Sequence, residues 1–306
     1  MELVNAERFA GTRTGVRIER ILCPVDFSEV SAQAYRYTQS MADHYHATLV
    51  AQHIVELWQH PSGFYSPSAQ LLEFRRNLVD DGQNDLQQFV RTFGGIQADC
   101  VVQEGSAADA ILCLARERTI SLIVLGTHGR RGFDRLMLGS VTERVLRHSS
   151  CPVLAIRQSA PDSSKLDSQD DSVLIRRILC CVDFSAHSER ALQYALSLAD
   201  VFDAEVIVLH VLDGTSCSSA IEKEAMTTRE NFEKLIPPAA HSSKRIHLTV
   251  RLGKAYQEIL QFASEVHSDV IVTGVHGRHA LDLAVFGSTS YRVIQLGPVP
   301  VLAVPI

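Results

Sequence analysis

The chain carries one pattern twice, and this internal duplication restricts the possible folds more than any other feature. Residues 18–56 (IERILCPVDFSEVSAQAYRYTQSMADHYHATLVAQHIVE) align without gaps with residues 175–213 (IRRILCCVDFSAHSERALQYALSLADVFDAEVIVLHVLD). Later in each copy, LGTHGRRGFDRLMLGS at 125–140 matches TGVHGRHALDLAVFGS at 273–288. Because such self-similarity marks a repeated structural unit, we expect two domains that share one fold.

Each copy alternates short apolar runs rich in β-branched residues with stretches whose apolar residues recur at helical spacing. The runs predict strands at 20–26, 48–55, 98–104, 122–127 and 152–157, and again at 177–183, 205–212, 246–252, 270–275 and 300–306. Ser28 and Ser185 stand where helix N-caps would fall. Apolar strands joined by helices indicate α/β domains, each with a five-stranded parallel sheet, helices on both faces and right-handed crossovers.

The segment between the copies, QSAPDSSKLDSQDDS at 158–172, has almost no large apolar side chains and cannot bury enough surface to fold. It is therefore interpreted as a linker. The predicted organisation is an N-terminal tail at 1–17, a first domain at 18–157, the linker, and a second domain at 173–306.

Composition and charge narrow the partners. The formal net charge of −6 argues against a protein built around phosphate-backbone contacts with nucleic acid. The sequence contains neither a run of about 20 apolar residues nor a secretory leader, so we expect no membrane segment and a cytoplasmic location. Seven scattered cysteines without a C-x-x-C pair predict reduced thiols, mostly in the core.

The glycine-containing segments are the strongest functional signal. Gly126, Gly129, Gly139 and Ser140 recur as Gly274, Gly277, Gly287 and Ser288, each set running from the end of the fourth strand to the start of a helix. Ligands of open parallel sheets bind beyond the carboxyl ends of the strands, where the strand order reverses. Glycines leave backbone N–H groups accessible, and a helix N-terminus favours anions, so the pattern predicts phosphate binding.

The serine hydroxyls could add donors, with Thr142, Thr289 and Ser290 as weaker candidates. An alternative stays open, in which the glycines only permit tight turns and close packing of helix on strand. The chain has neither G-x-x-x-x-G-K-[ST] nor G-x-G-x-x-G after a strand, so a P-loop NTPase and a Rossmann dehydrogenase are poor interpretations.

With its VDFS strand end, its HIVE or HVLD strand end and G-x2-G-x9-G-S, each copy resembles the ATP-binding branch of the universal stress protein family in its tandem form. The resemblance covers nearly the whole chain outside the tail and linker, and implies a strand order of 3-2-1-4-5 as in adenine nucleotide alpha hydrolase-like folds. It also implies that the first-strand aspartate binds the ribose or adenine side, an aliphatic residue packs on adenine, and the glycine loop holds the phosphates. The residues carried over for the first site are Pro24, Val25, Asp26, Ile54, Leu125, Gly126, Gly129, Arg130, Gly139, Ser140 and Val141, and for the second site Val182, Asp183, Val211, Thr273, Gly274, Gly277, Arg278, Gly287, Ser288 and Thr289.

Two departures predict unequal sites. The second copy has Cys181 where the first has Pro24, and Thr273 where the first has Leu125, so its adenine pocket should be more polar and bind more weakly. The aspartates could instead cap the helices that follow them, and this alternative also stays open.

Several other residues carry weaker signals. His128 and His276 lie inside the glycine segments without a sequence neighbour that would make a triad, and His44, His46 and His60 are interpreted as surface residues rather than metal ligands. Arginines after the second glycine could neutralise phosphates or be an ordinary solvated loop: Arg130, Arg131, Arg135 and Arg278. The segment around Trp58 is interpreted as a loop covering the sheet edge, with a lid or partner surface as the alternative.

The resemblance implies an ATP-binding stress or signalling protein, with Mg²⁺ held through the phosphates. The alternatives are a slow ATP hydrolase and an interaction module with empty sites, so enzyme activity is at most weak in this interpretation. The fifth strands would be exposed edges if left alone. We therefore expect the two copies to pair as an intramolecular pseudo-dimer, and association of two chains stays open.

Overall fold

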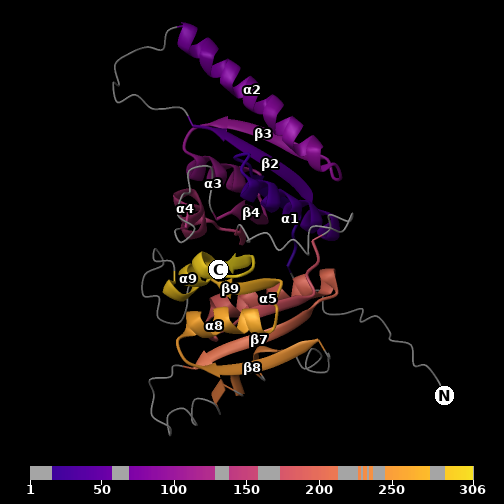
Figure 1. Cartoon of the computed structure of the whole chain (residues 1–306), viewed down its shortest axis with the longest axis vertical. Helices are drawn as coiled ribbons and strands as arrows, with labels where there is room; N and C mark the ends of the chain where they lie inside the picture. The colour runs from indigo at the N-terminus through magenta and orange to yellow at the C-terminus, as the bar shows by residue number, and fades with distance from the viewer. Residues whose placement is uncertain are drawn as a thin grey trace, which may run out of the picture.

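A computed structural model describes residues 16–56, 69–127, 138–157, 173–212, 227–228, 230–232, 234–236, 245–275 and 287–305. Two α/β halves lie one above the other, the first coloured indigo to magenta and the second orange to yellow (Figure 1). The first half contains β1 (Arg20–Pro24), α1 (Glu29–Tyr45), β2 (Thr48–Val55), α2 (Ala69–Phe93), β3 (Ala98–Glu104), α3 (Ala107–Glu117), β4 (Leu122–Gly126), α4 (Ser140–His148) and β5 (Val153–Ile156). The second contains β6 (Arg177–Cys181), α5 (Ala186–Phe202), β7 (Glu205–Leu212), β8 (Ile246–Leu252), α8 (Ala255–Glu265), β9 (Val270–Gly274), α9 (Ser288–Leu296) and β10 (Val301–Val304).

All these strands form one ten-stranded sheet in the order β3-β2-β1-β4-β5-β10-β9-β6-β7-β8. Every pairing inside a copy is parallel, which confirms the predicted doubly wound fold and the order 3-2-1-4-5. The two copies join through an antiparallel pairing of β5 with β10, in which Leu302 lies opposite Leu154. Since each fifth strand covers the edge of the other, the intramolecular pairing predicted for the two copies is confirmed.

Helices cover both faces of the sheet, and each face has a core that continues from one copy into the other. On one face, α1, α2 and α5 pack against the strands through residues such as Tyr35, Leu86 and Leu198. On the other face, α3, α4, α8 and α9 pack through a second set that includes Ile111 and Val293. The shared cores explain why the two copies form one body rather than two domains on a tether.

Helices α1 and α5 also touch across the junction between the copies. The Tyr45 hydroxyl lies 3.2 Å from Ser197 Oγ. The His44 ring stacks on Phe202, with 4.2 Å between ring centroids and 20° between planes. The prediction that His44 is a surface residue is confirmed, since the residue is exposed, and its ring also takes part in the contact between the copies. His46 has φ of 54° and closes the C-terminus of α1.

The predicted N-caps are confirmed. Ser28 accepts a hydrogen bond from the backbone N–H of Ser31, and Ser185 accepts one from the N–H of Ser188. Each serine follows the first strand of its copy closely. The cap therefore fixes the point at which the chain leaves the sheet and enters the first helix.

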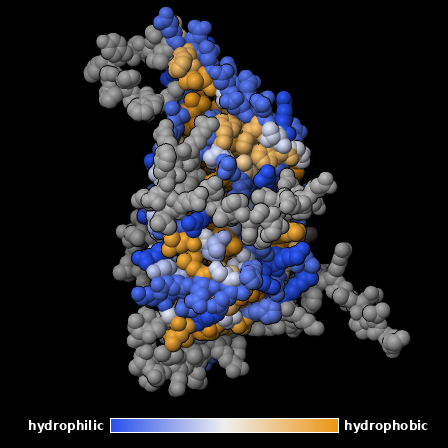
Figure 2. Space-filling model, in the orientation of Figure 1, coloured by the Kyte–Doolittle hydropathy of each residue, from blue (hydrophilic) through white to orange (hydrophobic). Residues whose placement is uncertain are grey.

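Helix α2 and strand β8 lie at the two outer ends of the molecule. In Figure 2 the long helix α2 has an orange side and a blue side, and Leu86 on its apolar side is fully buried. Its first turns reach beyond the sheet in Figure 1, where Phe74 is 56% exposed. At the other end of the molecule, β8 exposes Leu248, Val250 and Leu252, which alternate along the strand and so lie on one face.

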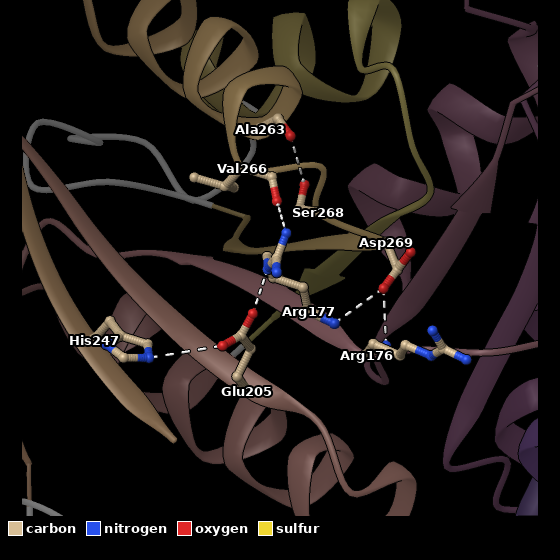
Figure 3. A network of polar contacts seen from close by, with 8 residues as sticks. All are labelled: Arg176, Arg177, Glu205, His247, Ala263, Val266, Ser268 and Asp269. Atoms are coloured by element: carbon tan, nitrogen blue, oxygen red, sulfur yellow. Dashed lines mark hydrogen bonds and ion pairs between the residues drawn. The ribbon is translucent and has the colours of Figure 1, made fainter. Parts of the chain in front are cut away.

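A network of polar contacts at the amino ends of the strands holds the second copy in register (Figure 3). Arg177 on β6 contacts both Glu205 on β7 and the Val266 carbonyl at the end of α8. One Asp269 oxygen accepts from the N–H groups of Arg176 and Arg177, at 2.8 and 3.0 Å. This network is structural, because it lies at the end of the sheet opposite to the expected ligand site.

Candidate functional site

The candidate site lies at the carboxyl ends of the strands, where the strand order reverses between β1 and β4. In the first copy β1 pairs with β2 on one side and β4 on the other, so the crevice opens between the ends of β1 and β4. Asp26 follows β1, Ile54 lies near the end of β2, Gly126 ends β4, and Ser140 begins α4. Topology therefore gathers these predicted residues at one edge of the sheet.

The aspartates after β1 and β6 are held by the serines that cap the next helix. Oδ1 of Asp26 accepts from the Ser28 N–H at 3.0 Å and from the Ser28 hydroxyl at 2.6 Å. Asp183 and Ser185 repeat this arrangement, at 3.1 and 2.6 Å. One oxygen thus supports the capping serine, as in the capping alternative, and this support fixes the orientation of the half-buried carboxylate.

An aromatic residue and a histidine, which the sequence analysis did not assign to the site, shape the turn that carries each aspartate. Phe27 and Phe184 have φ of 63° and 60°, a left-handed conformation that bulky residues adopt rarely. Nδ1 of His53 lies 2.8 Å from the Val25 carbonyl, and Nδ1 of His210 lies 2.7 Å from the Val182 carbonyl. The repetition of these residue types in both copies was the available signal.

Within the described residues, no side-chain cap bonds the N-termini of α4 and α9. Gly139 and Gly287 occupy the N-cap positions, and a glycine offers no side-chain acceptor to the first-turn N–H groups. Their φ values of −61° and −57° are open to any amino acid, so these glycines are not explained by backbone strain. Backbone bonds of 2.8 Å and 3.0 Å, from the Gly139 N–H to Thr127 and from the Gly287 N–H to Val275, instead join each helix start to the strand before it.

The residues of the first helical turn divide into two groups. The Thr142 hydroxyl donates to the Gly126 carbonyl at 2.7 Å, and the Ser290 hydroxyl donates to the Gly274 carbonyl at the same distance. These two weaker phosphate candidates therefore serve to tie helix to strand. Ser140 and Ser288 are exposed at the very start of their helices, where first-turn N–H groups have no partner inside a helix. This arrangement suits an anion.

Gly274 has a packing role of its own. A Cβ at this position would lie 2.8 Å from the Cβ of His187 and 2.9 Å from its backbone carbon, because the first turn of α5 crosses closely over the end of β9. The alternative in which glycines permit close packing of helix on strand therefore holds for this residue.

The apolar residues predicted for the two sites lie on two different faces. Ile54, Leu125 and Val141 contact the core on the α3 and α4 face, and Val211 does so in the second copy. The side chains of Val25 and Val182 belong to the opposite core, so only their backbone reaches the candidate site. Pro24 is half-buried at the end of β1 and Thr289 is half-buried in the first turn of α9.

Cys181 and Thr273, which distinguish the second site from the first, lie at the ends of β6 and β9. Cys181 and Thr273 are both buried, at 8% and 7% exposure. The Thr273 hydroxyl lies 3.4 Å from Ser290 Oγ and donates weakly to the Gly274 carbonyl, at 3.3 Å. Its polar atom is thus turned toward the start of α9 and already has partners there.

Part of the predicted site lies outside the described residues. The predicted site residues outside the described ranges are Gly129, Arg130, Gly277 and Arg278. The residues with weaker sequence signals that also lie outside them are Trp58, His60, His128, Arg131, Arg135 and His276. Within the described part of the chain, no group of three or more His, Cys, Asp or Glu side chains could hold a metal ion. The same residues include no helix with the length and apolar character needed to cross a membrane.

The cysteines in the described ranges are free thiols. Burial raises the pKa of Cys23 and of Cys181 to about 12, so both remain protonated at neutral pH. Adjacent Cys180 is also buried, and desolvation raises its thiol pKa well above the ordinary value. These thiols are core residues rather than nucleophiles.

A cavity of about 550 Å³ lies where α4, α8 and α9 meet. Ser288, at the start of α9, lines this cavity, and so do Arg147 and Arg292, each of which contacts another side chain. Arg147 contacts Glu143 at 2.8 Å, and Arg292 lies over the Tyr256 ring at 4.6 Å from its centroid. The cavity adjoins the second candidate site through Ser288.

The protein is a tandem α/β protein, with two doubly wound domains that each place one helix N-terminus where the strand order reverses. Comparisons with known proteins identify its family. A model of the Universal stress protein family matches residues 17–157 and 174–305. The chain therefore belongs to the universal stress protein family.

Individual relatives are of single-copy and tandem size. Universal stress protein MJ0531 of Methanocaldococcus jannaschii is 31% identical over 144 residues, which cover 46% of this chain and 82% of that protein. A universal stress protein of Mycolicibacterium smegmatis is 23% identical over 296 residues, 93% of this chain and 96% of its own length. The crystal structure of a universal stress protein from Archaeoglobus fulgidus shares the fold, with a TM-score of 0.66, 22% identity and coverage of 95% of this chain and 98% of that chain.

Proposed function

We propose that each copy binds one molecule of ATP and that the chain acts as a nucleotide-responsive stress or signalling protein. The observation that carries the proposal is the uncapped N-terminus of α4 and of α9 at the switch point of each copy. A triphosphate there would accept hydrogen bonds from first-turn N–H groups and from the exposed hydroxyl of Ser140 or Ser288. The same site type occurs twice, which predicts two equivalents of nucleotide per chain.

The rest of the nucleotide is assigned by chemistry. Asp26 and Asp183 are oriented carboxylates at strand ends, suited to accept hydrogen bonds from ribose hydroxyls. Ile54 and Val211 offer the aliphatic wall that a purine ring needs. Residues 126–140 and 274–288 would hold the phosphates, with Gly129, Arg130, Gly277 and Arg278 among them as proposals. Mg²⁺ would neutralise the triphosphate and take its ligands partly from the phosphates themselves.

Nucleotide analysis of the purified protein tests this function directly. The protein is denatured without added nucleotide, and the supernatant is separated by chromatography. Up to two equivalents of ATP support a sensor, ADP favours the slow hydrolase, and no nucleotide together with no binding of added ATP supports the empty interaction module. Cytoplasmic location and association of two chains stay predictions.

Single-site variants assign the two equivalents. Gly139→Asp and Gly287→Asp each place a carboxylate where the phosphates would lie, so each should remove one equivalent and leave the other copy occupied. Retention of both equivalents in either variant contradicts the site assignment. With the two variants in hand, calorimetry should also show weaker binding at the second site, and equal affinities would contradict that asymmetry.

A further inference from the structure

A pair of glutamine side chains lies beside the proposed adenine wall in the first copy only. Gln52 precedes Ile54 by two residues on β2, so both side chains lie on the same face of the sheet. In the parallel register, Ile54 pairs with Gln103 on β3. A base that packs on Ile54 therefore has Gln103 as its neighbour across the strands and Gln52 as its neighbour along the strand.

The hydrogen bonds of this pair fix the orientation of both amides. Gln52 is fully buried, and its Nε2 donates to Gln103 Oε1 at 2.7 Å and to the Ala110 carbonyl at 3.2 Å. A flipped Gln52 amide would place its oxygen against both acceptors, so only one orientation satisfies them. Because Gln103 uses its oxygen to accept from Gln52, its Nε2 remains as the outward donor.

The pair leaves one acceptor and one donor without partners in the described part of the chain. The buried Oε1 of Gln52 has no hydrogen-bond donor. Gln103 Nε2 has no protein acceptor there, and the side chain is half-buried. Because the Gln52 oxygen is shut off from solvent, Gln103 Nε2 is the group of this pair that can meet a ligand.

The second copy lacks this arrangement. Leu209, buried in the apolar core, takes the place of Gln52, and Arg251 takes the place of Gln103. Arg251 is directed toward α8, where it pairs with Glu265 and lies over the Phe262 ring at 4.6 Å from the centroid. Since an apolar residue serves the same position in the same fold, packing alone does not require the buried amide of the first copy.

We infer that Gln103, positioned by Gln52, reads the base edge at the first site and selects a 6-aminopurine. The inference rests on the proposed nucleotide binding. Gln103 Nε2 donates to N1 of adenine, an acceptor, while buried Gln52 holds the Gln103 amide in this orientation. Guanine carries an N1–H donor at the same position, which would face the Gln103 donor, and the amide held by Gln52 cannot rotate to present its oxygen instead. The second site has no such reader and discriminates less between purines.

The test uses the full-length Gly287→Asp protein, in which only the first site would bind, and titrates it calorimetrically with MgATP and MgGTP. We expect at least a tenfold preference for ATP. Gln103→Glu keeps an oxygen for the Gln52 amide but replaces the outward donor with an acceptor. It should therefore weaken ATP, tighten GTP, and change the ratio by tenfold or more toward GTP. Gln52→Leu, which introduces the residue of the second copy, should bring the ratio close to one.

A matched control uses the Gly139→Asp protein, in which only the second site would bind. There Gln103→Glu should leave the ATP and GTP affinities unchanged. If the Gly287→Asp protein binds no nucleotide, the proposed function fails and this inference fails with it. If it binds nucleotide but the ratio is unchanged by both Gln103→Glu and Gln52→Leu, only the inference is overturned, and the amide pair is a structural feature that a buried water completes.

Discussion

Aspartate at positions 139 and 287 should separate the stability of the helices from nucleotide binding. Both glycines are N-cap residues with φ and ψ of −61° and 141°, and of −57° and 130°. An aspartate adopts this conformation without strain and can accept hydrogen bonds from the first-turn N–H groups. Relative to glycine, an N-cap aspartate stabilises a helix by only a few tenths of a kcal/mol, and its negative charge near the N-terminus adds about 0.3–1 kcal/mol.

Without nucleotide, each variant should therefore be at least as stable as the natural protein. A gain of about 1 kcal/mol corresponds to a rise in the unfolding temperature of about 2–4 °C for a body of this size. With nucleotide at a hundred times its dissociation constant, each occupied site of the natural protein gains about 2.7 kcal/mol. The variants should lose that gain in the altered copy, because the carboxylate occupies the N–H groups and repels the phosphates.

Differential scanning calorimetry with and without MgATP measures both effects in one experiment. Gly139→Asn is the matched control, since asparagine caps a helix about as well as aspartate but carries no charge. Two results would refute the reasoning. A full ATP-induced shift in the double aspartate variant would show that phosphates bind elsewhere, and a lower unfolding temperature without nucleotide would show that the glycines are needed by the fold itself.

Two further predictions concern the core. Gly274→Ala should destabilise the protein by about 1–3 kcal/mol in urea unfolding, because the new Cβ would lie 2.8 Å from the Cβ of His187. The control Gly82→Ala in α2 should be neutral or stabilising, because its Cβ would meet only side chains, at 3.3 Å or more. Equal stability of the two variants would contradict this prediction. The free energy of unfolding should keep the full contribution of Cys23 and Cys181 below pH 9 and fall as the pH rises from 9 toward 12. The reason is that these thiols ionise near pH 9.0 in the unfolded chain, whereas burial raises their pKa to about 12 in the folded protein. A urea midpoint that stays constant from pH 8 to 10.5 would contradict the second prediction.

Local patterns in the sequence were enough to predict the architecture. The apolar runs located the strands to within about two residues, since burial on both faces demands continuous apolar side chains whatever their neighbours are. The capping serines Ser28 and Ser185 were predictable for the same reason, because a cap acts only on the turn next to it. The duplication then extended each conclusion from one copy to the other.

Residues at the strand exits were harder to place. Val25 and Asp26 are neighbours in sequence, yet the Val25 side chain enters the core of the opposite face while Asp26 is held by Ser28 at the crevice. The unusual φ of Phe27 and the contact of His53 with the Val25 carbonyl decide this geometry. Periodicity ends where the strand ends, so it does not predict the direction of these side chains.

The sequence by itself determined the duplicated α/β unit, the position of the glycine segments and the residue types available at each strand end. Only the tertiary structure decided which of those residues meet. Thr142 is bonded to the Gly126 carbonyl rather than left for a ligand, and Gln52 is bonded to Gln103, 51 residues away. The physical reason is that helix and strand patterns depend on neighbours within a few residues, whereas hydrogen bonds and packing at the site join segments that only the folded sheet brings together.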